Sequence, residues 1–134
     1  MTKEQLRSYQ SLKREQQQIL HQLEEVEAML YYPKIQQLTD MPIHHGAGNP
    51  MEDLILHHIE LQQQYRSKLE ELAEQQLAIE NAINTLDPTA RLLLRYRYLD
   101  GLKWEEICVK MSYGWTQIHH IHGEALKKLI AMED

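Results

Sequence analysis

The stretch that decides the fold is residues 104–121, WEEICVKMSYGWTQIHHI. Its first part places Ile107, Cys108 and Met111 on one face of a short helix. Ser112-Tyr113-Gly114 then interrupts the helical pattern, and the apolar spacing resumes after it, which predicts a second and longer helix. The inner face of this second helix consists of Ile118, Ile121, Ala125, Leu126 and Leu129. A short helix, a three-residue turn that contains glycine and a longer helix form a helix-turn-helix.

The outer face of the second helix is expected to read DNA. The start of that helix enters the major groove, where glutamine can pair with adenine, threonine can meet a thymine methyl group and histidine can donate to guanine. The residues expected there are Trp115, Thr116, Gln117, His119 and His120. The cations expected to hold the DNA backbone are Lys110, Lys127 and Lys128, together with Arg91, Arg95, Arg97 and Lys103.

The charge of the chain is divided unevenly. Residues 1–86 hold seven Lys or Arg against 13 Asp or Glu, whereas residues 87–134 hold seven of each, and the whole chain carries −6. The reading helix contains no arginine. We therefore expect modest affinity for DNA with a steep salt dependence, or affinity gained through dimerisation or a partner.

Two longer amphipathic segments precede this domain. Neither proline nor glycine occurs from Thr2 to Tyr32, and the apolar residues step by threes and fours, which predicts a helix over about 3–32. A loop is expected over about 39–50, where prolines and glycines cluster, and a second helix over about 51–85. Neither helix can bury its apolar stripe alone, so the two form an antiparallel hairpin or pair with a second copy of the chain.

Asp87-Pro88 predicts the start of the next helix. Aspartate can cap a helix N-terminus, and proline suits the first helical position, since its missing N–H would be unpaired there. This helix is expected to run to Tyr98 and to stop at Asp100-Gly101, where glycine can take the left-handed conformation. The sequence thus predicts an all-α chain, with a helical hairpin over residues 1–85 and a helix-turn-helix domain over residues 86–134.

Several runs resemble the fourth region of bacterial sigma factors: Leu86-Asp87-Pro88, the run LLLRYRYLDGLKWEEI over residues 92–107, Ile118-His119-His120-Ile121 and Ala125-Leu126-Lys127-Lys128-Leu129. In that family this region recognises a promoter element with its second helix. The whole chain is similar to small proteins of phages and prophages grouped with RinA-like or ArpU-like regulators of late transcription. Those proteins carry Ser at the position of Gly114 and often Arg at that of His120.

Other classes of function find little support in the sequence. The eight histidines lack a His-Glu-x-x-His pattern, so we expect solvated or DNA-facing histidines and no metal site. No nucleophile with a base and no phosphate-binding motif occurs, so neither an enzyme nor a cofactor is expected. The lone Cys108, the polar start of the chain and the absence of a membrane-length apolar run favour a cytoplasmic protein that meets no membrane.

Three hypotheses about function follow. The leading one is a phage-type transcriptional regulator that binds promoter DNA as double-stranded DNA and forms a homo-oligomer through its N-terminal helices. The second is a DNA-packaging or structural adaptor in which the same motif grips DNA. The third is a protein-interaction module that contacts sigma factor or RNA polymerase.

Overall fold

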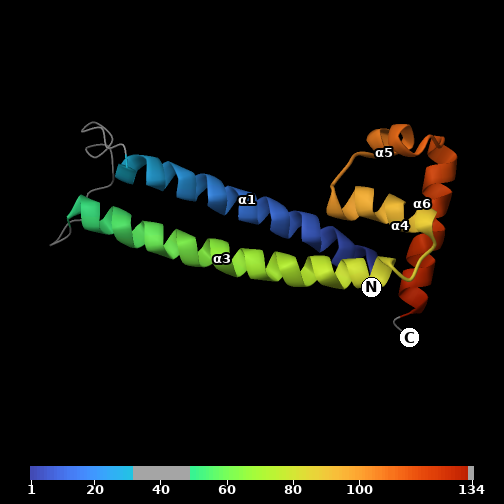
Figure 1. The fold of residues 1–134 in the computed structure, drawn as a ribbon, viewed down its shortest axis with the longest axis horizontal. Coiled ribbons are helices and arrows are strands. Elements are labelled where there is room, and N and C mark those ends of the chain that lie inside the picture. The colour runs from blue at the N-terminus through green and yellow to red at the C-terminus, as the bar shows by residue number, and fades with distance from the viewer. Residues whose placement is uncertain (32–48, 133–134) are drawn as a thin grey trace. The chain divides into compact units, whose positions relative to one another are not determined.

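The structure is a computed structural model that describes residues 1–31 and 49–132. Its regular elements in these ranges are all helical (Figure 1), which confirms the predicted class. They are α1 (Lys3–Tyr31), α3 (Pro50–Ile83), α4 (Pro88–Leu94), the π-helical turn η1 (Arg95–Leu99), α5 (Trp104–Met111) and α6 (Trp115–Ala131). The loop predicted over residues 39–50 lies outside the described residues except for Asn49 and Pro50. Pro50 is already helical, and the Asn49 side chain accepts a hydrogen bond from the Met51 N–H at 2.9 Å.

The chain divides into two compact units. We call Arg14–Glu70 the middle unit, and Met1–Lys13 together with Glu71–Asp134 the terminal unit. Helices α1 and α3 each contribute residues to both.

In the middle unit, residues 14–31 of α1 and 50–70 of α3 lie side by side and run antiparallel (Figure 1). Lys68 Nζ lies 2.9 Å from Glu15 Oε2, and His58 Nε2 lies 3.2 Å from Glu27 Oε1, so residues near the start of one segment meet residues near the end of the other. The core between the segments consists of Leu23, Val26, Leu54 and Leu61.

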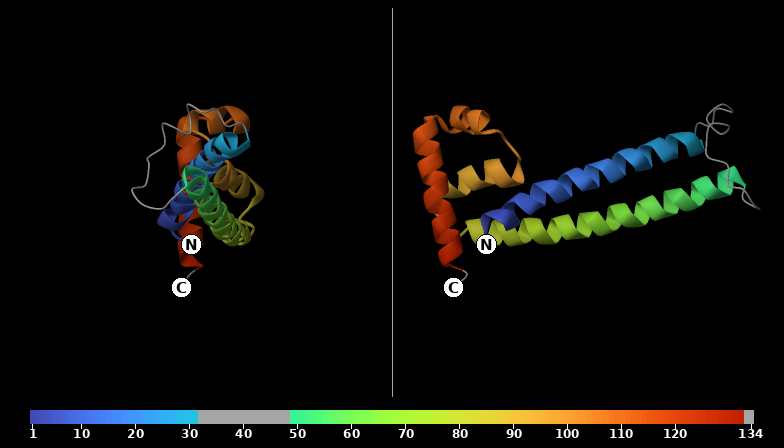
Figure 2. Two further views of the ribbon diagram at one scale, coloured as in Figure 1. Left: turned by 90° about the vertical axis from the view of Figure 1, so that its left-hand side faces the viewer. Right: turned by 180° about the vertical axis from the view of Figure 1, so that it is seen from behind.

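The terminal unit joins both ends of the chain around one core. Leu6 and Tyr9 of α1 and Ile79 and Ile83 of α3 are buried in the same cluster as Leu129 of α6. Helices α4 and α5 both pack against α6, at the orange-to-red end of the colour range (Figures 1 and 2). This core combines residues of the two predicted ranges, 1–85 and 86–134, whose independence as domains stays a prediction.

Helix α4 begins and continues for local reasons. Asp87 accepts a hydrogen bond from the Ala90 N–H at 3.2 Å and Pro88 occupies the first turn, as predicted. The sequence predicts an ordinary helix to Tyr98, but its last turn is wider, and the Asp100 N–H bonds to the Arg95 carbonyl five residues back. The wider turn buries two adjacent pairs five positions apart, Leu93-Leu94 and Tyr98-Leu99.

Gly101 ends this helical segment in the left-handed conformation, with φ +71°, as predicted. A Cβ atom at Gly101 would lie only 2.8 Å from Gln10 Oε1. Gln10 is held there because its Nε2 donates to the carbonyls of Tyr98, at 2.7 Å, and Leu99, at 3.1 Å. Both the backbone angle and the close approach of α1 therefore favour glycine at this position.

Substituting alanine at Gly101 and at Gly123 should have opposite effects on stability. Gly101→Ala should lower the free energy of unfolding by about 1–2 kcal/mol, because a Cβ is strained at positive φ. Gly123 lies inside α6, where an added Cβ would meet nothing within 4 Å, so Gly123→Ala should raise the free energy of unfolding by about 0.5–1 kcal/mol. Urea titration followed by circular dichroism measures both, and a stabilised Gly101→Ala would contradict the account of this turn.

Candidate nucleic-acid interface

The turn between α5 and α6 is short and tightly bonded. Ser112 takes the left-handed conformation with φ 57°, and the Tyr113 N–H bonds to the Cys108 carbonyl at 3.2 Å. Gly114 is extended, with φ −75°, and forms the N-cap of α6. Ser112, and not Gly114, is therefore the residue of this turn that takes the left-handed conformation, and its Cβ makes that conformation strained.

A small cluster of aliphatic side chains determines which face of α6 points outward. Leu93 of α4, Ile107 of α5 and Ile118 of α6 meet there, and each is 0% exposed. Along the rest of α6, Ala125 and Leu129 are buried, and Ile121 and Leu126 are half-buried, so the predicted inner face is confirmed. The opposite face of α6 is consequently open.

Most of the residues predicted to read DNA lie on this open face. Thr116, His120 and Lys127 are exposed and follow one line along α6, since they are spaced four and seven residues apart. Gln117 is exposed beside them, and the Trp115 side chain is 55% exposed at the first position of the helix. The structure thus brings Trp115, Thr116, Gln117 and His120 together at the N-terminal end of α6.

His119 occupies a different position from the one predicted. Its ring centroid lies 4.6 Å from that of Trp104 and 4.3 Å from that of Trp115, so the ring lies between the two indoles. Its Nε2 atom is buried and has no hydrogen-bond partner among the described residues. The guanidinium carbon of Arg97 lies over the Trp104 ring, 4.4 Å from its centroid. This ladder of Arg97, Trp104, His119 and Trp115 positions the exposed indole, so His119 supports Trp115 and does not itself lie on the outer face.

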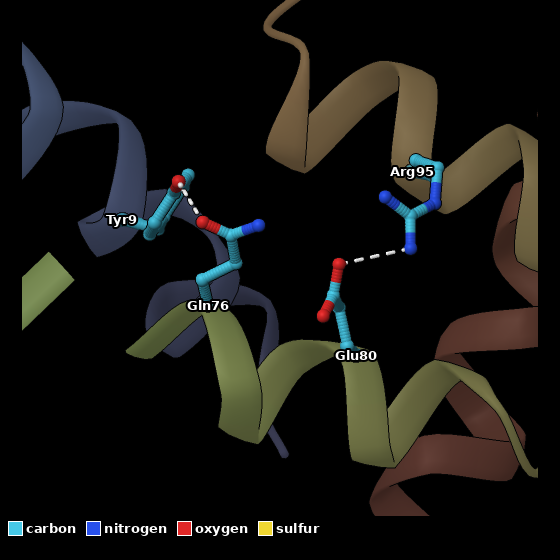
Figure 3. A network of polar contacts seen from close by, with 4 residues as sticks. All are labelled: Tyr9, Gln76, Glu80 and Arg95. Carbon is cyan, nitrogen blue, oxygen red and sulfur yellow. Dashed lines mark hydrogen bonds and ion pairs between the residues drawn. The ribbon is translucent and has the colours of Figure 1, made fainter. Parts of the chain in front are cut away.

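Two of the cations expected to hold DNA also have partners within the fold. Arg95 Nη2 lies 3.0 Å from Glu80 Oε1 on α3 (Figure 3). Arg97 Nη1 donates to the Leu102 carbonyl at 3.0 Å, besides its contact with Trp104. In the same region Tyr9 Oη donates to Gln76 Oε1 at 3.3 Å (Figure 3), and burial and then the charges of Glu80 and Asp100 raise the pKa of the Tyr9 hydroxyl.

The other predicted cations lie nearer to solvent. Lys110 is exposed and its Nζ lies 5.4 Å from the centroid of the Tyr96 ring. Lys127 Nζ lies 3.5 Å from Glu124 Oε1, and both side chains are more than half exposed, so this ion pair contributes little. Lys128 and Lys103 are exposed and Arg91 is half-buried. The other five predicted cations are Arg91, Lys103, Lys110, Lys127 and Lys128.

His122 is a second histidine that sequence reasoning placed wrongly. We expected solvated or DNA-facing histidines, but the His122 side chain is 7% exposed and its Nε2 lies 2.6 Å from Tyr98 Oη. Burial, followed by the positive charges of Lys3, His119, Arg97 and Arg7, lowers the pKa of His122 to about 4. The ring is therefore uncharged at neutral pH, and its Nε2 accepts a hydrogen bond from the Tyr98 hydroxyl. Burial raises the pKa of that hydroxyl. The spacing could have revealed this, because His122 follows Ile118 by four residues and precedes Ala125 by three.

The structure adds limited information about metals and membranes. Both His119 and His122 contact Trp104, but residues 1–31 and 49–132 contain no group of three or more side chains suited to holding a metal ion. His44 and His45 lie outside the described residues. Among the helices of the described ranges, none has the length and apolarity needed to cross a bilayer.

Comparison of the chain with protein-family models, with curated proteins and with solved structures gives no match.

Proposed function

We propose that the chain binds double-stranded DNA through a helix-turn-helix formed by α5, residues 112–114 and α6, and that it is a phage-type regulator of transcription. The observation that carries this proposal is the cluster of Leu93, Ile107 and Ile118, which takes one fully buried residue from each of three helices. This cluster leaves Thr116, Gln117 and His120 exposed on the first turns of α6. A second helix oriented in this way can present these side chains to base edges in the major groove.

The exposed residues suit different parts of this task. The Gln117 amide can make two hydrogen bonds to adenine, and His120 can donate to guanine or to a phosphate. The exposed indole of Trp115, supported by His119, provides an apolar surface for a thymine methyl group or a sugar. In this proposal α1 and α3 form a helical hairpin that precedes the DNA-reading domain and determines its oligomeric state.

The charge of the interface implies a moderate and measurable salt dependence. Five cations remain for phosphate contacts once Arg95 and Arg97 are assigned to the fold. If all five meet phosphates, the logarithm of the binding constant should fall with the logarithm of the salt concentration with a slope of about −4.5. A clearly steeper slope for one copy of the chain would mean that the two arginines leave their internal partners.

Gln117→Ala and His120→Ala should each weaken binding to the preferred site by about 1–3 kcal/mol, because each removes a base contact in the major groove. Each should also relax the preference at one base position. The preferred site is obtained by selecting random duplexes with the purified chain, and affinities are then measured by fluorescence anisotropy at one salt concentration. Gln18→Ala is the matched control, since Gln18 is an exposed helical glutamine on α1.

The selection also distinguishes the competing functions. One enriched motif supports the regulator, whereas uniform and salt-sensitive binding favours a packaging or structural adaptor. No binding at about 50–100 mM salt would contradict DNA binding altogether.

A second function, docking of a protein partner such as RNA polymerase or sigma factor, is favoured by one separate observation. Helices α4 and α5 enclose a groove of about 310 Å³. Leu92 at this groove is 41% exposed, and Val109 on α5 is 79% exposed. Leu92→Gln should abolish such docking and leave DNA affinity within about twofold, because Leu92 lines the groove, lies on α4 outside the proposed DNA-reading face, and is replaced without a change of charge.

A further inference from the structure

Helix α3 carries two apolar seams, and among residues 14–31 and 49–70 of the middle unit the packing covers only one of them. The covered seam faces α1 and consists of Leu54, His58, Leu61, Tyr65 and Lys68. Its residues are spaced by four, three, four and three, which is the heptad spacing of helices that pack along their length.

The second seam begins one residue later and repeats the same spacing. It consists of Ile55, Ile59, Gln62, Arg66 and Leu69. Its aliphatic side chains are open, with Ile55 45% exposed and Ile59 and Leu69 each 43% exposed. A helix with two heptad seams on adjacent faces is suited to contact two helical partners, whereas a helix at the outside of a bundle needs only one seam.

A groove accompanies the second seam. It has a volume of about 440 Å³ and lies between Ile59 and Leu69, with Leu23 of α1 and Tyr65 also in its wall. The walls are therefore apolar at both ends and polar in the middle, where Gln62 and Arg66 lie. An aliphatic side chain from a facing helix fits the apolar ends of such a groove.

We propose that the second seam binds α3 of a second copy of the chain, antiparallel and across a twofold axis near Gln62. The seam is self-complementary about this point. A twofold axis there places Ile55 against Leu69 of the partner subunit and Ile59 against the aliphatic stem of the partner's Arg66. With α1 alongside each α3, the contact forms a bundle of four helices over the length of the seam, about 21 Å.

The position of Arg66 favours the antiparallel direction. In a parallel pair the two guanidinium groups would lie opposite each other, and like charges at close range oppose association. In the antiparallel pair they lie eight residues apart along the axis, about 12 Å, which exceeds the screening length at physiological salt.

Sedimentation equilibrium of the purified chain without DNA tests the association. We expect a monomer–dimer equilibrium with a dissociation constant on the order of 10 µM. Ile59→Lys should weaken it at least 30-fold, because it places a charge in the apolar part of the seam. Ile130→Lys is the matched control, since Ile130 is 49% exposed but lies on α6, and it should leave the equilibrium unchanged. A wild-type chain that stays monomeric at several hundred micromolar, or an Ile59→Lys chain that dimerises like the wild type, overturns the proposal.

Disulfide cross-linking tests the register. In a Cys108→Ala background, Gln62→Cys should form a cross-linked dimer within minutes of oxidation, because position 62 faces its own copy at the axis. Ile55→Cys should not cross-link alone but should do so when mixed with Leu69→Cys. Equal cross-linking of Ile55→Cys and Gln62→Cys would establish a parallel pair and overturn the antiparallel assignment. Neither test depends on DNA binding, so the dimer and the proposed function can fail separately.

Discussion

Replacing Ile118 by alanine should lower the free energy of unfolding by about 3 kcal/mol. Ile118 is 0% exposed and meets Leu93 and Ile107, so truncation leaves a cavity where three helices join. Urea titration followed by tryptophan fluorescence measures the loss, because Trp104 and Trp115 both belong to the terminal unit.

The control for this prediction lies on the same helix. Ile130 is 49% exposed on α6, and Ile130→Ala removes the same atoms from a partly open site. It should cost less than about 1 kcal/mol, as expected of a surface substitution. Equal losses for the two variants would mean that the cluster of Leu93, Ile107 and Ile118 does not hold α6 in place, and the proposed orientation of the reading face would lose its support.

The second large effect is a loss of stability in acid that arises from His122. In the unfolded chain this histidine takes up a proton near its ordinary pKa of 6.5, whereas in the folded chain its pKa is lowered to about 4. Between these two values the unfolded state binds more protons, so the free energy of unfolding falls as the pH falls from 6.5 to 4. Above about pH 7 the free energy of unfolding does not depend on His122. The total loss is about 3 kcal/mol.

His122→Gln isolates this contribution. The glutamine amide oxygen can still accept a hydrogen bond from the Tyr98 hydroxyl, but the amide group does not titrate. Urea unfolding between pH 4 and pH 8 should show the wild type losing about 3 kcal/mol relative to the variant on acidification, with a constant difference above pH 7. Parallel curves over the whole range would show that His122 keeps its ordinary pKa in the folded chain. The groups that face it from the packed elements are Lys3, Arg7, Arg97, Tyr98 and His119.

The helices could be predicted because their signals are local. Helix α1 was expected over about 3–32 and α3 over about 51–85, and both ends agree within two residues. Asp87 and Gly101 were assigned correctly, since a cap and a left-handed glycine depend on neighbours in the chain. The widened turn of η1 was not predicted. The sequence does contain its signal, because the apolar pairs Leu93-Leu94 and Tyr98-Leu99 are five residues apart.

The partners of polar side chains could not be predicted, because they come from distant parts of the sequence. Arg95 was counted as a cation for DNA, but its partner Glu80 lies on α3. In sequence, His119 lies among the residues of the reading face. In the structure its ring packs against Trp104 of α5 and against Trp115. Sequence spacing indicates the face of a helix on which a residue lies. Only the packed structure shows which charged side chains have partners on other helices.

The core that α1 and α3 share with α6 also constrains when these helices can pack together during synthesis. Leu6 and Tyr9 share a cluster with Leu129, which a ribosome adds about 120 residues later. At about 5–20 residues per second, the N-terminal apolar side chains wait on the order of 10 s for their partners. During that time the growing chain exposes the apolar side chains of α1 that later pack in the same cluster as α6. Removing α6 would make this transient exposure permanent.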